Sequence, residues 1–134
     1  MSGARTKGGT HLGRVRGLGS AREGAGHWLT HRMTALGNIL LFSWLAASLL
    51  TNDFSSYNAA RSWVSEPLVA LPLILLLVNV FWHFRIGLQV LIEDYVHGPL
   101  RIAALAALNF YVFGGAAFGI FAILRIVFTG TTGA

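Results

Sequence analysis

Cysteine is absent from this sequence and charged side chains are scarce, and each absence narrows the class of protein. Without cysteine, the chain has no disulfide framework, no Cys-ligated cluster and no thiol nucleophile. Only 11% of the residues are charged and 54% are hydrophobic, whereas an average soluble domain has about 25% charged residues. With a mean hydropathy of +0.62, the composition predicts a membrane protein, in which any metal is held by histidine, carboxylate or a cofactor.

Three long apolar runs divide the 134-residue chain. They extend over residues 33–50, 68–92 and 102–128, and each is close to or above the roughly 20 residues that cross about 30 Å of hydrocarbon as a helix. We therefore expect an all-α membrane protein with three transmembrane helices. The stretch between the first two runs is predicted to be a loop, in which Ser65 suits the N-cap of the second helix.

The basic residues are concentrated before the first apolar run. The formal net charge is +5, and the basic residues of this region are Arg5, Lys7, Arg14, Arg16, Arg22 and Arg32. This bias indicates membrane topology rather than a nucleic-acid-binding face. Residues 1–26 lack the apolar core of a secretory signal and are predicted to form a Gly-rich cytoplasmic arm, in preference to an organellar transit peptide. Residues 27–134 then form the transmembrane domain, with the N-terminus inside and the C-terminus outside.

One histidine lies deep in the second apolar run. His83 is eight or nine residues before its inner end, which places it about 12–14 Å below the interface at about 1.5 Å per residue. An imidazole at this depth is a functional hypothesis by default, although it can also be a structural residue bonded to a Ser, Asn or carbonyl of a neighbouring helix. Asn79, His83, Gly87 and Asp94 share one helical face, and Gly87 leaves space for a broad planar ligand such as haem b.

Acidic and aromatic residues crowd the inner end of the same helix. Asp94 and Tyr95 follow His83 by 11 and 12 residues, where a phenol can donate a hydrogen bond to a quinone carbonyl and a carboxylate can order it or move protons. Tyr95 alone would equally suit an aromatic belt. His97, Gly98 and Pro99 are expected to form the turn that ends the helix, with His97 either solvated or acting as a proton relay.

Two further features concern packing. Ala103 and Ala107, and then Gly115 and Gly119, place small residues at four-residue spacing in the third run, which permits close approach by a helix of this chain or of a partner. Arg85 points away from the His83 face, and we expect it to reach the headgroups or to pair with a partner carboxylate.

The pattern of His83, Gly87, Asp94 and Tyr95, with "DYVHG" following, resembles the hydrophobic membrane anchor of succinate dehydrogenase, the D-type, cytochrome b subunit of respiratory complex II. The segment "GHWLTHRMTAL", residues 26–36, is also similar to the entry of that subunit into its first helix. The similarity extends from about Leu18 to Leu124 in helix number and motif placement, and only the motif at residues 83–98 is specific.

The resemblance implies a role for each residue of the motif. His83 would be an axial ligand of the haem b iron, with the second ligand from a partner anchor. Tyr95 would donate a hydrogen bond to ubiquinone and Asp94 would support it. Arg32 would contact a haem propionate or the quinone pocket, with His27 as a weaker candidate there. On physical grounds, Arg32 is equally explained by positive-inside anchoring.

The implied function is that of a non-catalytic membrane subunit of succinate:ubiquinone oxidoreductase, linking respiratory electron transfer to the tricarboxylic acid cycle. Its partners would be a second anchor (a C-type cytochrome b subunit), an iron-sulfur subunit, a flavoprotein subunit and membrane lipid, with no nucleic acid. A bacterial inner membrane is preferred to a mitochondrial one. The alternatives are a haem-free structural anchor, a small proton carrier using His83, Asp94 and His97, and the anchor of a quinol:fumarate reductase.

Overall fold

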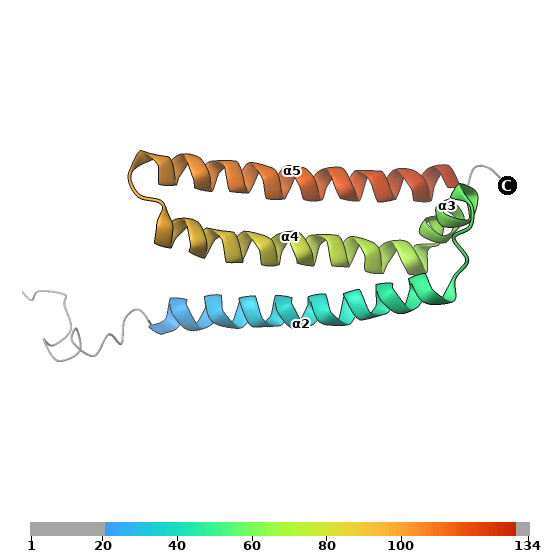
Figure 1. Ribbon diagram of the computed structural model, residues 1–134, viewed down its shortest axis with the longest axis horizontal. Helices are drawn as coiled ribbons and strands as arrows, with labels where there is room; N and C mark the ends of the chain where they lie inside the picture. Colours follow the sequence, from blue (N-terminus) through green and yellow to red (C-terminus); the bar gives the residue numbers. More distant parts are fainter. Residues whose placement is uncertain (1–20, 131–134) are drawn as a thin grey trace, which may run out of the picture. The chain divides into compact units, whose positions relative to one another are not determined.

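The computed structural model describes residues 21–130, and this part of the chain is entirely helical apart from short connections. Its four helices are α2 (Ala21–Thr51), α3 (Tyr57–Ser65), α4 (Pro67–Tyr95) and α5 (Pro99–Gly130) (Figure 1). The chain divides into two compact units, Met1–Thr30 and His31–Ala134, and the packing discussed below concerns the second. The predicted all-α class is confirmed. The predicted arm of residues 1–26 lies largely outside the described residues, and α2 begins within its range at Ala21.

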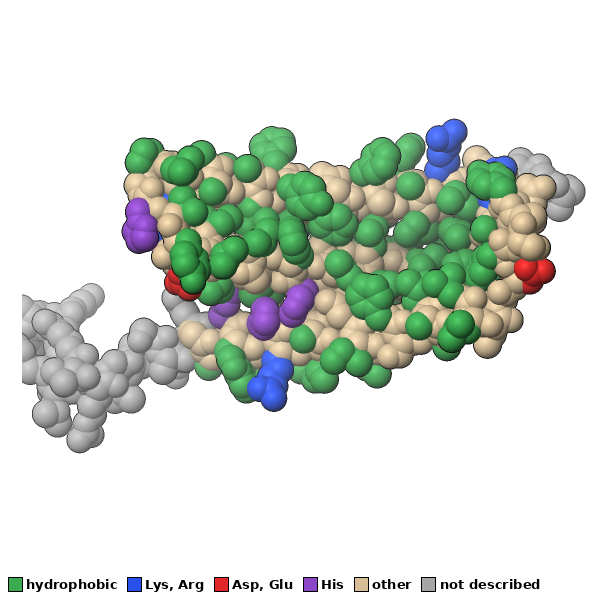
Figure 2. Space-filling model, in the orientation of Figure 1, with side chains coloured by type: hydrophobic (Ala, Val, Ile, Leu, Met, Phe, Trp, Pro, Cys, Tyr) green, Lys and Arg blue, Asp and Glu red, His purple; other side chains and the backbone are tan. Residues whose placement is uncertain are grey.

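Three of the helices are long and apolar enough to cross a membrane, as predicted. They comprise Gly24–Thr51, Pro67–Tyr95 and Pro99–Gly130, and each extends beyond the apolar run that predicted it. Few of their side chains are buried against one another, and large apolar side chains cover most of the visible surface (Figure 2). Helices that are apolar all round require an apolar environment such as the interior of a membrane.

Helix α4 packs most extensively against α5, and glycines on α5 allow the two helices to approach closely. A Cβ placed on Gly115 would lie 2.8 Å from the Phe81 ring, and one on Gly119 would meet Leu77. Both glycines therefore serve packing within this chain. The sequence left open whether the small residues contact a helix of this chain or of a partner, and for Gly115 and Gly119 the contact is with α4 of the same chain. Ala103 and Ala107 are exposed in the second unit.

The stretch between the first two spans contains a helix that the sequence reading missed. Ser56 caps α3, and its hydroxyl accepts a hydrogen bond from the Ala59 amide at 3.1 Å. Trp63 of α3 stacks on Trp44 with ring centroids 6.3 Å apart and meets Phe54 edge-on at 5.2 Å. The prediction of Ser65 as the N-cap of α4 is wrong. Ser65 is the last residue of α3, its hydroxyl donates to the Ser62 carbonyl, and Glu66 occupies the cap position instead.

The turn between α4 and α5 has the predicted composition and a clear conformational reason for it. Gly98 adopts φ +71°, a left-handed conformation that costs an L residue about 1–2 kcal/mol. Pro99 then begins α5, where its missing N–H is not needed. This tight connection places the end of α4 beside the start of α5.

Candidate functional site

His83 lies half-buried on α4, and its ring is held by α2. Nδ1 of His83 is 3.0 Å from Oγ1 of Thr34. The Thr34 hydroxyl has only one hydrogen, and its oxygen is also 2.9 Å from the His31 carbonyl. With that hydrogen donated to the carbonyl, the Thr34 oxygen accepts from Nδ1–H of His83, and this tautomer leaves the Nε2 lone pair for a metal. Metal-bound histidines commonly have their other N–H fixed in this way.

The sequence reading did not single out His31 or Thr34. The His31 ring stacks on the His83 ring with centroids 4.5 Å apart and an interplanar angle of 26°. His31, Thr34 and Asn38 are spaced at three and four residues on α2 and so share one helical face. That spacing is the signal that could have identified them.

One turn before His83 on α4, a second set of hydrogen bonds joins the same two helices. Asn79 uses both N–H groups of its amide, donating at 2.8 Å to the Thr34 carbonyl and at 2.8 Å to Oδ1 of Asn38. Gly37 permits this contact, because a Cβ there would lie 2.9 Å from the Asn79 nitrogen. Polar groups within a membrane need such internal partners, and these bonds fix the rotation of α4 that directs His83.

The predicted space at Gly87 is present. A Cβ built on Gly87 would meet nothing within 4 Å, and Gly87 follows His83 by one turn on the same face. The site thus combines an oriented imidazole with an open stretch of helix surface, as a haem requires. Within residues 21–130, no group of three or more His, Cys, Asp or Glu side chains comes together, so an iron at His83 needs further ligands from outside this set.

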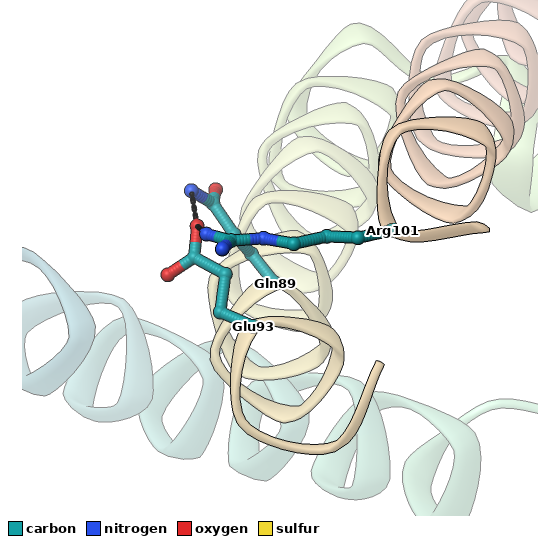
Figure 3. Close-up of polar contacts among 3 residues, drawn as sticks. All are labelled: Gln89, Glu93 and Arg101. Atoms are coloured by element: carbon teal, nitrogen blue, oxygen red, sulfur yellow. Dashed lines mark hydrogen bonds and ion pairs between the residues drawn. The ribbon is translucent and has the colours of Figure 1, made fainter. Parts of the chain in front are cut away.

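The C-terminal end of α4 carries two neighbouring carboxylates with different surroundings. Oε1 of Glu93 accepts a hydrogen bond from Gln89 at 3.0 Å and lies 3.9 Å from Nη2 of Arg101 (Figure 3). Asp94 is exposed, and its carboxylate has no hydrogen bond or ion pair within the described residues. Asp94 is therefore the carboxylate available for chemistry, whereas Glu93 ties the end of α4 to the start of α5.

Tyr95 ends α4 with its side chain 78% exposed. It borders a shallow apolar hollow of about 220 Å³ formed with Leu91, Ile92 and Val96. An aromatic hydroxyl beside an apolar surface can bind a ring that carries a carbonyl group. His97 lies in the adjoining turn and is exposed.

The imidazole and the acidic turn are separate parts of the site. Along α4, Asp94 and Tyr95 lie about 16 and 18 Å from His83 at about 1.5 Å per residue. The described residues provide no hydrogen bond from His83 to Asp94 or His97. A proton path from His83 to this turn would therefore need water or partner groups between them.

Arg85 makes contacts other than those expected. Its Nε donates to Oδ1 of Asn109 on α5 at 2.7 Å, and its guanidinium lies 5.4 Å and 5.9 Å from the ring centroids of Trp82 and Phe113. Pairing of the remaining N–H groups of Arg85 with headgroups or a partner carboxylate stays a prediction. The side-chain amide of Asn109 accepts one hydrogen bond from the Arg85 guanidinium, and the aromatic rings of Trp82 and Phe113 lie near its positive charge.

The remaining predicted residues lie on α2. Arg32 is exposed and directly follows His31, which stacks on His83, so Arg32 is at the same level of the second unit as the imidazole. His27 belongs to the first unit and is exposed. The structure thus brings Arg32 to the level of His83 and leaves the role of His27 a prediction.

Three helices long and apolar enough to span a membrane, with His83 at the contact of α2 and α4 and with Asp94 and Tyr95 at the end of α4, describe a multi-pass membrane protein. Residues 6–124 match the family of succinate dehydrogenase/fumarate reductase transmembrane subunits. The succinate dehydrogenase hydrophobic membrane anchor subunit of Rickettsia bellii is 34% identical over 99 residues, covering 73% of this chain and 79% of the relative. That of Rickettsia conorii is 32% identical over 84 residues, covering 62% and 67%. The chain belongs to the family of succinate dehydrogenase hydrophobic membrane anchor subunits.

Proposed function

We propose that this anchor subunit provides one axial ligand of a haem b, through Nε2 of His83. The observation that carries the proposal is the contact of Nδ1 of His83 with the Thr34 hydroxyl, which also contacts the His31 carbonyl. The tautomer with Nδ1 protonated satisfies both contacts and leaves the Nε2 lone pair for iron. The open helix surface at Gly87 supports it, because a planar macrocycle can lie there without displacing a side chain. Haem b, when bound, supplies one-electron redox chemistry that no side chain of this chain can supply.

The second axial ligand comes from a second anchor subunit, a C-type cytochrome b chain. On α2, large apolar side chains such as Leu36, Ile39 and Leu40 are exposed. A partner helix can therefore pack on this chain. Arg32 is positioned to pair with an acidic group such as a haem propionate, and His27 is a further candidate for that region. An iron-sulfur subunit and a flavoprotein subunit complete the complex on the side of the basic arm.

Ubiquinone is reduced at the inner end of α4. Tyr95 donates a hydrogen bond from its hydroxyl to a quinone carbonyl, and the apolar hollow beside it accommodates the ring. Full reduction of a quinone takes two electrons and two protons. Asp94, exposed at the water interface and not held in an ion pair within the described helices, orders Tyr95 and passes protons from water toward the site.

The orientation follows from the positive-inside rule. The basic arm, the Tyr95 end and the soluble subunits lie on the cytoplasmic side of a bacterial inner membrane, and the C-terminus lies outside. The division into a basic arm and a transmembrane domain is kept in this proposal, with the first helix α2 beginning at Ala21. The family also includes fumarate reductase subunits, but the relatives described above are succinate dehydrogenase anchors, which favours succinate as the electron source.

The quinone assignment is tested by comparing two electron acceptors in the assembled complex. Tyr95→Phe removes one hydroxyl, and we expect succinate:ubiquinone activity to fall about tenfold or more while succinate oxidation by a soluble dye is unchanged. Tyr111→Phe is the matched control, because Tyr111 lies on α5 with its ring 6.1 Å from those of Phe81 and Phe84. Equal loss of both activities in Tyr95→Phe, or equal loss of quinone reduction in the two variants, contradicts the assignment.

A further inference from the structure

A larger hollow lies at the opposite end of the second unit from Tyr95, between α3 and α5. It has a volume of about 420 Å³ and is lined chiefly by Tyr57, Arg61, Phe118, Phe121, Arg125 and Thr129. The His83 and Tyr95 sites use none of these residues. The hollow combines two cations, two hydroxyl groups and aromatic side chains.

The two arginines are placed for an anion. Nη2 of Arg61 donates to Oγ1 of Thr129 at 3.0 Å, and the Thr129 hydroxyl donates to the Arg125 carbonyl at 2.6 Å. These bonds hold the Arg61 fork in place and leave its other N–H groups available. Arg125 is exposed, and in the described range neither arginine has a carboxylate within 4.0 Å. The hollow therefore has two positive charges that no acidic side chain of residues 21–130 neutralises.

The rest of the lining is apolar and follows one face of α5. Phe118, Phe121, Arg125 and Thr129 are separated by three or four residues, so they lie along one stripe of the helix. Phe118 is 75% exposed and Phe121 is 63% exposed. The stripe thus begins at the charged end of the span and continues toward its middle as an open aromatic surface. A ligand that matches it has an anionic head and a hydrocarbon tail.

We propose that this hollow binds an anionic phospholipid of the surrounding leaflet. The phosphate lies between Arg61 and Arg125, whose planar guanidinium groups bind phosphate oxygens by paired hydrogen bonds. Tyr57 and Thr129 border the headgroup, and an acyl chain lies against Phe118 and Phe121. The lipid joins α3 to α5 and anchors this end of the subunit in the bilayer. The proposal is independent of the haem and quinone assignments.

Native mass spectrometry of the purified four-subunit complex tests the site. The delipidated complex is titrated with phosphatidylglycerol and, separately, with phosphatidylcholine, and the lipid retained after collisional activation is counted. We expect the wild type to retain phosphatidylglycerol preferentially, and the double variant Arg61→Gln with Arg125→Gln to lose affinity for it by about tenfold or more. Arg101→Gln, which removes an arginine at the other end, is the matched control and should retain the lipid.

Four results would overturn the proposal. The first is equal retention of phosphatidylglycerol by wild type and double variant. The second is equal retention of both lipids by the wild type, because the arginines then do not select charge. The third is loss of a partner subunit from the spectra of the double variant, which would show that the arginines bind a protein carboxylate. Displacement of the lipid by millimolar inorganic phosphate would likewise show that the site recognises a free anion. The helical circular dichroism of each variant is recorded to confirm that it is folded.

Discussion

Oγ1 of Thr34 accepts a hydrogen bond from Nδ1 of His83 across the interface of α2 and α4, at 3.0 Å. The Thr34 hydroxyl also lies 2.9 Å from the His31 carbonyl, and with its hydrogen on that carbonyl its oxygen accepts from His83. In that arrangement a residue of the first span selects Nε2 as the nitrogen of the second-span histidine that can bind a metal. The proposed haem ligation depends on both helices rather than on His83 alone.

Replacing Thr34 tests this dependence. Thr34→Val keeps the shape of the side chain and removes its oxygen, leaving the His83 N–H without its partner. We expect haem affinity to fall by about 10–100-fold, as for other outer ligand partners, and the reduction potential of the remaining b-type haem to rise because the imidazole becomes a weaker base. Thr34→Ser should restore both properties. A redox titration and the haem content of the purified complex measure them, and unchanged values in Thr34→Val would contradict this role.

The open surface at Gly87 gives a second prediction. Gly87→Leu adds a side chain where the chain itself presents nothing within 4 Å of a Cβ, so the subunit should still fold and insert. If a haem lies against this surface, the leucine excludes it and haem content should fall to a small fraction of the wild-type value.

The matched control is Gly114→Leu on α5, where a Cβ also meets nothing within 4 Å. Subunit amounts in the membrane are compared by immunoblot and haem by the pyridine haemochrome assay. Normal haem content in Gly87→Leu would place the haem elsewhere, and equal loss in both variants would indicate that bulk on any helix disturbs assembly.

The two neighbouring carboxylates should differ in function. Asp94→Asn removes the charge that lacks an ion pair within residues 21–130. We expect ubiquinone reduction to slow by about tenfold or more, because groups that transfer protons typically contribute about a hundredfold or more to a rate. Glu93→Gln alters a group held by Gln89 and Arg101, and because that pair is partly exposed, its loss should cost less than about 1 kcal/mol of stability with little effect on turnover. Steady-state rates with ubiquinone and with dye separate the two, and the reverse order of effects would contradict the assignment of Asp94.

The spans and the inner turn could be predicted from the sequence because their signals are local. Long apolar runs predict membrane helices, and Gly98 followed by Pro99 predicts a helix end and a helix start. The depth of His83 and the small side chain of Gly87 follow from spacing on one helix. The structure confirms the three long apolar helices and the space at Gly87.

The remaining features depend on contacts between helices, which spacing along one helix does not give. The pairing of His83 with Thr34, and of Arg85 with Asn109, joins residues on different spans. Helix α3 was missed because its nine residues form no long apolar run, and the Ser56 cap and Trp63 packing stabilise it. The distinction between Glu93 and Asp94 arises only when the turn brings Arg101 beside α4.

The central claim is that Nε2 of His83 binds haem iron, and the most direct measurement is the dithionite-reduced minus oxidised optical spectrum of the membrane complex. Wild type is compared with His83→Ala and with His97→Ala, which removes an exposed histidine of the turn. We predict a b-type signal in wild type and His97→Ala, and its loss or displacement in His83→Ala with all subunits present. An unchanged b-type signal in His83→Ala, or no b-type signal in the wild type, would contradict the account.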